Sequence, residues 1–191
     1  MNKNFFVLFV IIAIGLAIFF IVRYRRKDIH KTLYKAAKRG NLKKVKALIA
    51  KGADINCKNK NERTPLYIAS DKGKIQVVEY LLSLKDKDGK LRVVVDSVDK
   101  DGETALHVAA DEGYLPIVRF LIEVGDADIN KQDKDLDTPL HKSADEGYLN
   151  IVRYLIEKKA DTKIKNKKGR TPIEEAKNEG QEEVVKFLEG K

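Results

Sequence analysis

Residues 111–123 read DEGYLPIVRFLIE, and residues 145–157, 34 positions further on, read DEGYLNIVRYLIE. The two stretches differ at two of their thirteen positions. Self-similarity at a fixed period of roughly 20–50 residues is typical of stacked supersecondary units rather than of a single globule. The chain is therefore predicted to be a repeat array, and its function is expected to be binding rather than catalysis.

Five repeat starts align on this period. They read Thr32-Leu33-Tyr34, Thr64-Pro65-Leu66-Tyr67, Thr104-Ala105-Leu106-His107, Thr138-Pro139-Leu140-His141 and Thr171-Pro172-Ile173-Glu174. Their aligned apolar residues are 33, 40, 34 and 33 positions apart. After each start come small residues, then a glycine and an apolar run like that of residues 117–122. The period therefore extends over most of the chain.

Each part of the repeat has a physical role in a pair of helices. Threonine can accept a hydrogen bond from an unpaired N–H group at a helix start, and proline has no N–H group to leave unpaired there. The glycine allows the left-handed backbone that ends the first helix. Leu149, Val152 and Leu155 follow at helical spacing and predict a second helix with one buried face.

These motifs resemble the ankyrin repeat family, whose units are about 33 residues long and carry the pattern T-P-L-H-x-A. In this chain Ser143 replaces the final alanine of one unit and Ala105 the proline of the unit before it. The resemblance covers roughly residues 31–191 and implies an all-α ankyrin repeat solenoid of about five helix-loop-helix units. The fold class expected for the whole chain is this solenoid preceded by a single N-terminal transmembrane helix, which the apolar run described below predicts. The ankyrin repeat domain is assigned to residues 30–191, with repeats at about 30–58, 59–98, 99–132, 133–165 and 166–191. The chain is also similar to short ankyrin repeat proteins of intracellular bacteria.

One unit is longer than the others. The spacing from Leu66 to Leu106 exceeds the 33-residue period by seven, and the extra residues lie within 85–96. Asp88-Gly89 is a turn signal and residues 91–95 have β character. We expect a longer hairpin finger, which either maps to the binding face, as insertions in such arrays often do, or is neutral loop drift.

The front of the chain is apolar. Residues 5–22 form an unbroken run of eighteen apolar residues, long enough as a helix to span about 27 Å of a bilayer core. We predict a short tail (1–4), a transmembrane helix (5–22) and a basic juxtamembrane linker (23–29). The alternative is an exported periplasmic or host-directed protein with a cleaved or reversed signal, although no small-residue cleavage site follows the run.

Positive charge suggests the orientation. Arg23, Arg25, Arg26 and Lys27 follow the apolar run and are expected at the membrane surface, which places the repeats in the cytoplasm. Residues 1–60 carry a net charge of +13 and residues 61–191 carry −4. We expect the basic first repeat to face the anionic leaflet, with a solvated capping face as the alternative. Nucleic acid is disfavoured as a partner because interleaved aromatic residues are lacking.

Catalytic and metal-binding motifs are absent from the sequence. His107 and His141 occupy the repeat motif, where the resemblance implies a structural hydrogen-bonding role. Cys57 is the single cysteine, which excludes an intrachain disulfide or a cysteine zinc site. Neither a glycine-rich phosphate loop nor a complete calcium loop is present. We therefore expect no enzyme activity, no cofactor, no metal and no small-molecule substrate.

The expected partner is another protein, bound as the family binds its partners, through hairpin tips and the concave face of the first helices. The candidate contact residues are Lys100, Asp101, Glu103, Asp111, Glu112, Lys134, Asp135, Asp137, Asp145 and Glu146. Asp111 and Glu112 recur one unit later, so they predict a ladder of like charge that favours a basic surface on the partner. The alternative is that two duplicated units share these acids by descent. The predicted function is a membrane-tethered, non-catalytic scaffold or recruiter.

Overall fold

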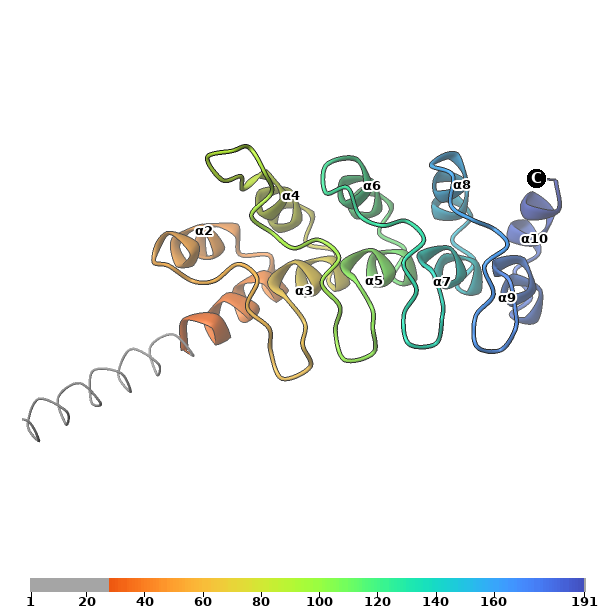
Figure 1. Cartoon of the computed structure of the whole chain (residues 1–191), viewed down its shortest axis with the longest axis horizontal. Coiled ribbons are helices and arrows are strands. Elements are labelled where there is room, and N and C mark those ends of the chain that lie inside the picture. Colours follow the sequence, from red (N-terminus) through yellow and green to blue (C-terminus); the bar gives the residue numbers. More distant parts are fainter. Residues whose placement is uncertain (1–27, 191) are drawn as a thin grey trace, which may run out of the picture.

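The computed structural model describes residues 28–190, which form a row of helix pairs (Figure 1). The first pair is a helix over residues 28–39 with α2 (Leu42–Ala50); the others are α3 (Pro65–Asp71) with α4 (Ile75–Ser83), α5 (Ala105–Asp111) with α6 (Leu115–Glu123), α7 (Pro139–Asp145) with α8 (Leu149–Glu157), and α9 (Pro172–Asn178) with α10 (Glu182–Glu189). The described chain contains no strand beyond one isolated bridge. The expected all-helical repeat array is confirmed.

The repeat threonines begin the inner helices, as predicted. Thr64 is the N-cap of α3, and its hydroxyl accepts a hydrogen bond from the backbone N–H of Tyr67 at 3.2 Å. Thr171 begins α9, where its backbone N–H donates to the carboxylate of Glu174 at 2.7 Å. Caps of this kind contribute about 1 kcal/mol each, so the local sequence sets where α3, α5, α7 and α9 start. Thr32 is an exception, because it lies inside the helix 28–39, where its hydroxyl donates to the carbonyl of Asp28 at 2.8 Å.

The turn glycines let neighbouring units approach closely. Gly73 and Gly113 have φ angles of +64° and +79°, in the left-handed region. A Cβ on Gly73 would lie 2.8 Å from the ring of Tyr114, and one on Gly113 would lie 2.9 Å from the ring of Tyr148. Each tyrosine belongs to the next unit, so glycine is needed both for the turn and for the stacking.

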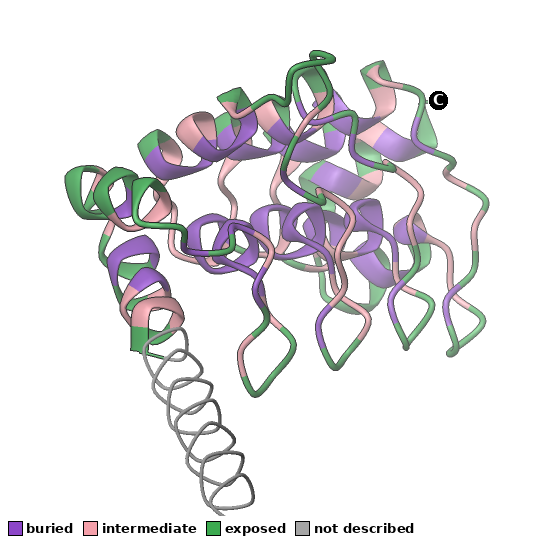
Figure 2. Ribbon diagram, turned by 60° about the vertical axis from the view of Figure 1, so that its left-hand side comes forward, coloured by how far each residue is buried: buried purple, intermediate pink, exposed green. Residues whose placement is uncertain are grey.

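The core is a continuous apolar layer between the two rows of helices (Figure 2). The inner helices α3, α5, α7 and α9 pack in sequence, and Leu66, Leu106 and Leu140 are at most 1% exposed. Burying such a side chain stabilises the fold by roughly 1.5–3 kcal/mol. Because each unit contacts its immediate neighbours, stability is built by stacking rather than around one centre.

The insertion forms a hairpin, as expected, and it lies away from the hairpin tips. Lys85 and Leu91 form an antiparallel bridge, and the carboxylate of Asp86 accepts from the N–H groups of Asp88 (2.9 Å) and Lys90 (3.0 Å). Figure 1 shows this loop at the end of α4, on the opposite side of the array from the hairpin tips. The insertion therefore does not lengthen a hairpin tip, and its role in binding stays a prediction. Residues 92–95 pair with no strand.

The predicted transmembrane helix (5–22) and the basic residues 23–27 lie outside the described residues. From residue 28 to residue 190, no helix is both long and apolar enough to cross a bilayer. The described helix already includes residues 28 and 29, which the sequence assigned to the linker. Ile29 packs against the core, so the array extends to at least this point.

Candidate functional site

The hairpin tips are joined to one another along the array. The backbone N–H of Lys134 donates to the carbonyl of Asp101 at 2.9 Å, and that of Lys167 donates to the carbonyl of Asp135 at 2.9 Å. Lys100 makes the same bond to Asn61 at 3.1 Å. The tips therefore form one continuous edge of fixed spacing, on which side chains of successive units lie next to each other.

The side chain of Asp99, which is buried, supports its hairpin tip from within. The carboxylate of Asp99 accepts from the N–H groups of Asp101 (2.8 Å) and Glu103 (3.2 Å), and it pairs with Arg63 at 2.9 Å. Burial would raise the pKa of Asp99, but these hydrogen bonds outweigh it and lower the pKa. The acidic stretch 99–103 is therefore held in place by a carboxylate that caps its own loop.

The two motif histidines fasten each inner helix to the following hairpin. In His107, Nδ1 lies 2.8 Å from the hydroxyl of Thr104, and Nε2 lies 3.1 Å from the carbonyl of Asp137. His141 makes the equivalent contact with the carbonyl of Arg170 at 3.1 Å. Burial lowers the pKa of both imidazoles, which favours the neutral form. Their interpretation as structural hydrogen-bonding residues is confirmed.

The acids at the ends of α5 and α7 share one hollow on the inner-helix side. Asp111, Asp145, Lys142 and Glu175 all line it. Burial raises the pKa of Asp111 to about 6; Lys142 opposes the rise, while Glu103 and the neighbouring acids add to it. Burial, with repulsion from Glu179 and Glu175, also raises the pKa of Asp145. The predicted repulsion within the ladder is therefore present.

Two of the sequence-predicted contact residues are already engaged inside the array. Glu103 accepts a hydrogen bond from the hydroxyl of Tyr67 at 2.9 Å and pairs with Lys142 at 3.2 Å. Asp137 accepts from the side-chain amide of Asn166 at 2.7 Å. Both stabilise contacts between units, and their role as partner contacts stays a prediction. The exposed members of the set are Lys100, Asp101, Glu112, Lys134, Asp135 and Glu146.

Lys142 is a central residue that sequence reasoning missed. Its ammonium lies 3.0 Å from Asp133 and 3.2 Å from Glu103, which come from two successive hairpins. Burial alone would lower the pKa of Lys142, but Asp133 and Glu103 raise it above the ordinary value. In the sequence, the signal for this role was the position of Lys142 inside the repeat motif, at which the third unit has Val108.

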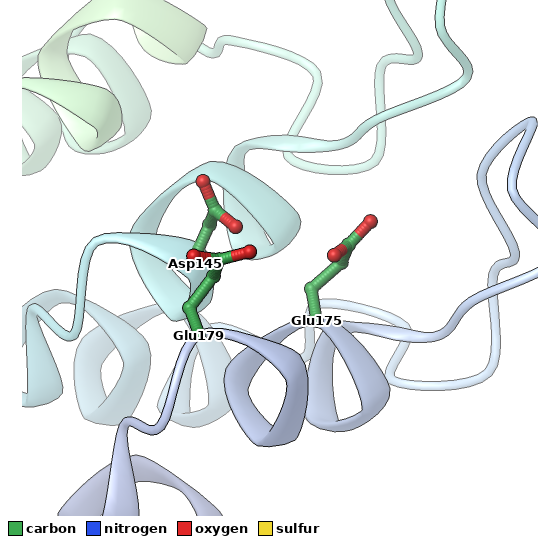
Figure 3. A group of neighbouring side chains, drawn as sticks. All are labelled: Asp145, Glu175 and Glu179. Atoms are coloured by element: carbon green, nitrogen blue, oxygen red, sulfur yellow. The ribbon is translucent and has the colours of Figure 1, made fainter.

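A second missed feature is a group of acids between α7 and α9. Figure 3 shows the carboxylates of Asp145, Glu175 and Glu179 side by side, with one oxygen of each within 4.8 Å of the others. The charge of Glu175 is already offset by Arg170 at 3.0 Å and Lys168 at 3.3 Å. Asp145 and the exposed Glu179 therefore extend the acidic surface of the third and fourth units to the fifth.

Leu136 is an apolar residue at a hairpin tip. It is 41% exposed and has a φ of 59°, at the position where the hairpins before and after it carry Gly102 and Gly169. The tip thus combines an exposed leucine with the carboxylate of Asp135. This exposed leucine was not predicted, although a leucine at a position that is glycine in the neighbouring hairpins is visible when the hairpin sequences are aligned.

A family model described as ankyrin repeats (3 copies) matches residues 33–133 and 124–190. The two matches together extend from the first described unit to the last. Comparison with curated proteins gives no match, so the resemblance to bacterial proteins remains an expectation.

Proposed function

Because this chain belongs to the ankyrin repeat family, whose repeats are protein–protein interaction modules, we propose that it recruits a protein with a basic surface to a membrane and has no catalytic activity of its own. The partner contacts the exposed tip residues and the acidic inner-helix ends of the third and fourth units. Residues 5–22 hold the array at the bilayer, with the repeats on the cytoplasmic side.

The raised pKa values of Asp111 and Asp145 carry the partner-binding part of the proposal. Two carboxylates that line one hollow, partly buried and repelled by neighbouring acids, reduce the stability of the free array. A cationic side chain from a partner would relieve this repulsion on binding. This gain in binding free energy supports the retention of acids that the stacking of the units does not require.

The tether rests on the sequence. The run of eighteen apolar residues matches the thickness of a hydrocarbon core, and the richer cluster of positive charge follows it rather than precedes it. The family match begins at residue 33, so the apolar run stands before the matched repeats.

Charge reversal at exposed positions tests the partner surface without disturbing the half-buried acids. We expect Asp101→Lys, Glu112→Lys, Asp135→Lys and Glu146→Lys together to lose the proteins that the unchanged chain captures from a detergent extract of its own cells. Exposed acids on the outer helices provide a control. The double variant Glu157→Lys with Glu183→Lys should still capture the same proteins. Equal capture by both variants, with unchanged circular dichroism, would rule out this surface.

Proteolysis of intact cells tests the tether and its orientation. The proposal predicts repeats that are protected from external protease, a chain that resists carbonate extraction, and an N-terminus that retains residues 5–22. A mature chain that begins after residue 20, or repeats cleaved in intact cells, would instead indicate the exported alternative.

A further inference from the structure

The first unit presents a surface of a single charge. Residues 31–51 contain eight Lys or Arg and no acid, and all eight side chains are exposed. They are Lys31, Lys35, Lys38, Arg39, Lys43, Lys44, Lys46 and Lys51. In the described part of the chain, none of them forms an ion pair with a carboxylate. This charge is therefore available to something outside the array.

The cations lie on an outward face of the first helix pair. Lys31, Lys35 and Lys38 follow one another at four- and three-residue spacing along the helix 28–39, so they share one side of it. Leu33 and Ala37, at the intervening positions, are fully buried. Figure 1 shows this helix at the end of the row, where no described unit covers it.

Two of these lysines occupy positions that are buried in the next unit. Lys35 aligns with Ile68 and Lys44 with Val77, 33 residues later. Ile68 is 9% exposed and Val77 is fully buried. Both positions carry lysine in the first unit, so the end that would otherwise be apolar is basic.

If this end of the array were only exposed to solvent, its charged side chains would not all need to have the same sign. At the other end of the array, α10 carries Glu182, Glu183 and Glu189 with Lys186. Equivalent inner-helix positions also reverse sign along the row, from Lys38-Arg39 in the first unit to Asp111-Glu112 in the third. The cations are thus concentrated at the end of the array that adjoins the apolar run.

We propose that the basic first unit, defined by these eight cations, binds the headgroups of an anionic bilayer. This contact orients the array so that its acidic units lie away from the membrane. This inference rests on the proposed tether. Five residues separate Val22 from Asp28, and they span at most roughly 18 Å. The lysines are therefore held close to the leaflet, and screening at physiological salt acts over about 8 Å.

Lysine reactivity in vesicles tests the contact with the whole chain. The full-length protein is reconstituted in phosphatidylcholine vesicles, with or without about one third phosphatidylserine, and labelled with a membrane-impermeant acetylating reagent. We expect Lys31, Lys35 and Lys38 to react at least about threefold more slowly in the anionic vesicles, with the difference lost in about 0.5 M salt. Lys163 and Lys165, exposed in the last hairpin, should react equally in both and serve as internal references.

Matched variants separate the contact from the tether. Lys31→Glu, Lys35→Glu and Lys38→Glu together should abolish the lipid-dependent protection of Lys43 and Lys46, whereas Lys163→Glu with Lys165→Glu should preserve it. Equal reactivity of the first-unit lysines in both vesicles would overturn the inference. So would protection by a short DNA duplex but not by phosphatidylserine, which would assign the surface to nucleic acid. A chain that does not float with phosphatidylcholine vesicles would refute the tether itself.

Discussion

Leu136 holds a backbone conformation that leucine rarely adopts. Its φ of 59° places the side chain against the following carbonyl, a conflict that costs about 1 kcal/mol for residues other than glycine. The neighbouring hairpins have glycine at this position and avoid the conflict. The side chain is 41% exposed, so its partial burial offsets only part of this free-energy cost. The residue is therefore a place where stability can be gained locally.

We expect Leu136→Gly to be more stable than Leu136→Ala by about 1 kcal/mol, because both lose the leucine side chain and only glycine is unstrained at positive φ. Compared with the unchanged chain, Leu136→Gly should gain about 0.5 kcal/mol in free energy of unfolding, since glycine has more conformational freedom in the unfolded state. Urea denaturation of the three proteins provides the comparison. An alanine variant as stable as the glycine variant would contradict the assignment of strain.

Asp111 should make stability depend on pH. Its folded pKa of about 6 lies above the ordinary value of 3.8, so the folded state favours the protonated carboxyl. Stability is therefore lost as the pH rises from about 4 to 6. We expect Asp111→Asn to stabilise the array by about 1 kcal/mol at pH 7.5, after allowance for solvent screening, and to have no effect at pH 4.

The control is the equivalent acid of the second unit. Asp71 lies 3.1 Å from Lys72, so Asp71→Asn should bring no gain at either pH. Thermal unfolding of both variants at the two pH values measures the difference. A gain from Asp111→Asn that is the same at pH 4 and pH 7.5 would mean that ionisation is not its cause.

At the scale of elements, the side chain of Asn56 attaches the insertion after α4 to the array. The amide of Asn56 donates to the carbonyl of Arg92 at 2.9 Å and accepts from the N–H of Val94 at 2.9 Å. The β character of residues 91–95 predicted pairing with a strand. In the structure, Arg92 and Val94 form hydrogen bonds with the side chain of Asn56 instead. Val93, between these two contacts, is 4% exposed and joins the core.

We expect Asn56→Ala to increase hydrogen exchange at the amide of Val94 by about tenfold, because each lost hydrogen bond contributes about 1 kcal/mol. The aligned residue Asn130 accepts from the N–H of Asp161 at 2.9 Å in the fourth unit. Asn130→Ala should therefore increase exchange at Asp161 and leave Val94 unchanged. If Val94 exchanged at the same rate in both variants, the insertion would be held by other contacts.

For the whole molecule, the stacking order predicts where unfolding begins. Among the described outer helices, α4 lies between α2 and α6, and α6 lies between α4 and α8, whereas α10 packs beside α8 alone. In a linear array, stability is a sum of unit and interface terms, so an end unit with one interface opens most readily. We expect amides of α10 to exchange at least about tenfold faster than those of α6 in the full-length protein. Uniform exchange across the helices would indicate a single cooperative unit instead.

The sequence by itself determined the units, their order and their local boundaries. Thr64, Gly73 and their equivalents act within a few residues of the chain, as caps and turns, and so can be recognised without tertiary information. Four of the five repeat starts belong to the same class, whereas the histidines also bond to the following hairpin, about 30 positions further along the chain. This is the part of the fold that a repeated local pattern encodes.

Only the tertiary structure decided which acids are free and where the insertion lies. Glu103 meets Tyr67 and Asp137 meets Asn166 across 36 and 29 positions of the chain, and Lys142 joins two hairpins. In a stack, residues about one period apart become neighbours, so burial and charge pairing depend on contacts between units. A single unit read alone therefore cannot tell that Asp111 is half-buried and Glu112 exposed, although the two are adjacent in the sequence.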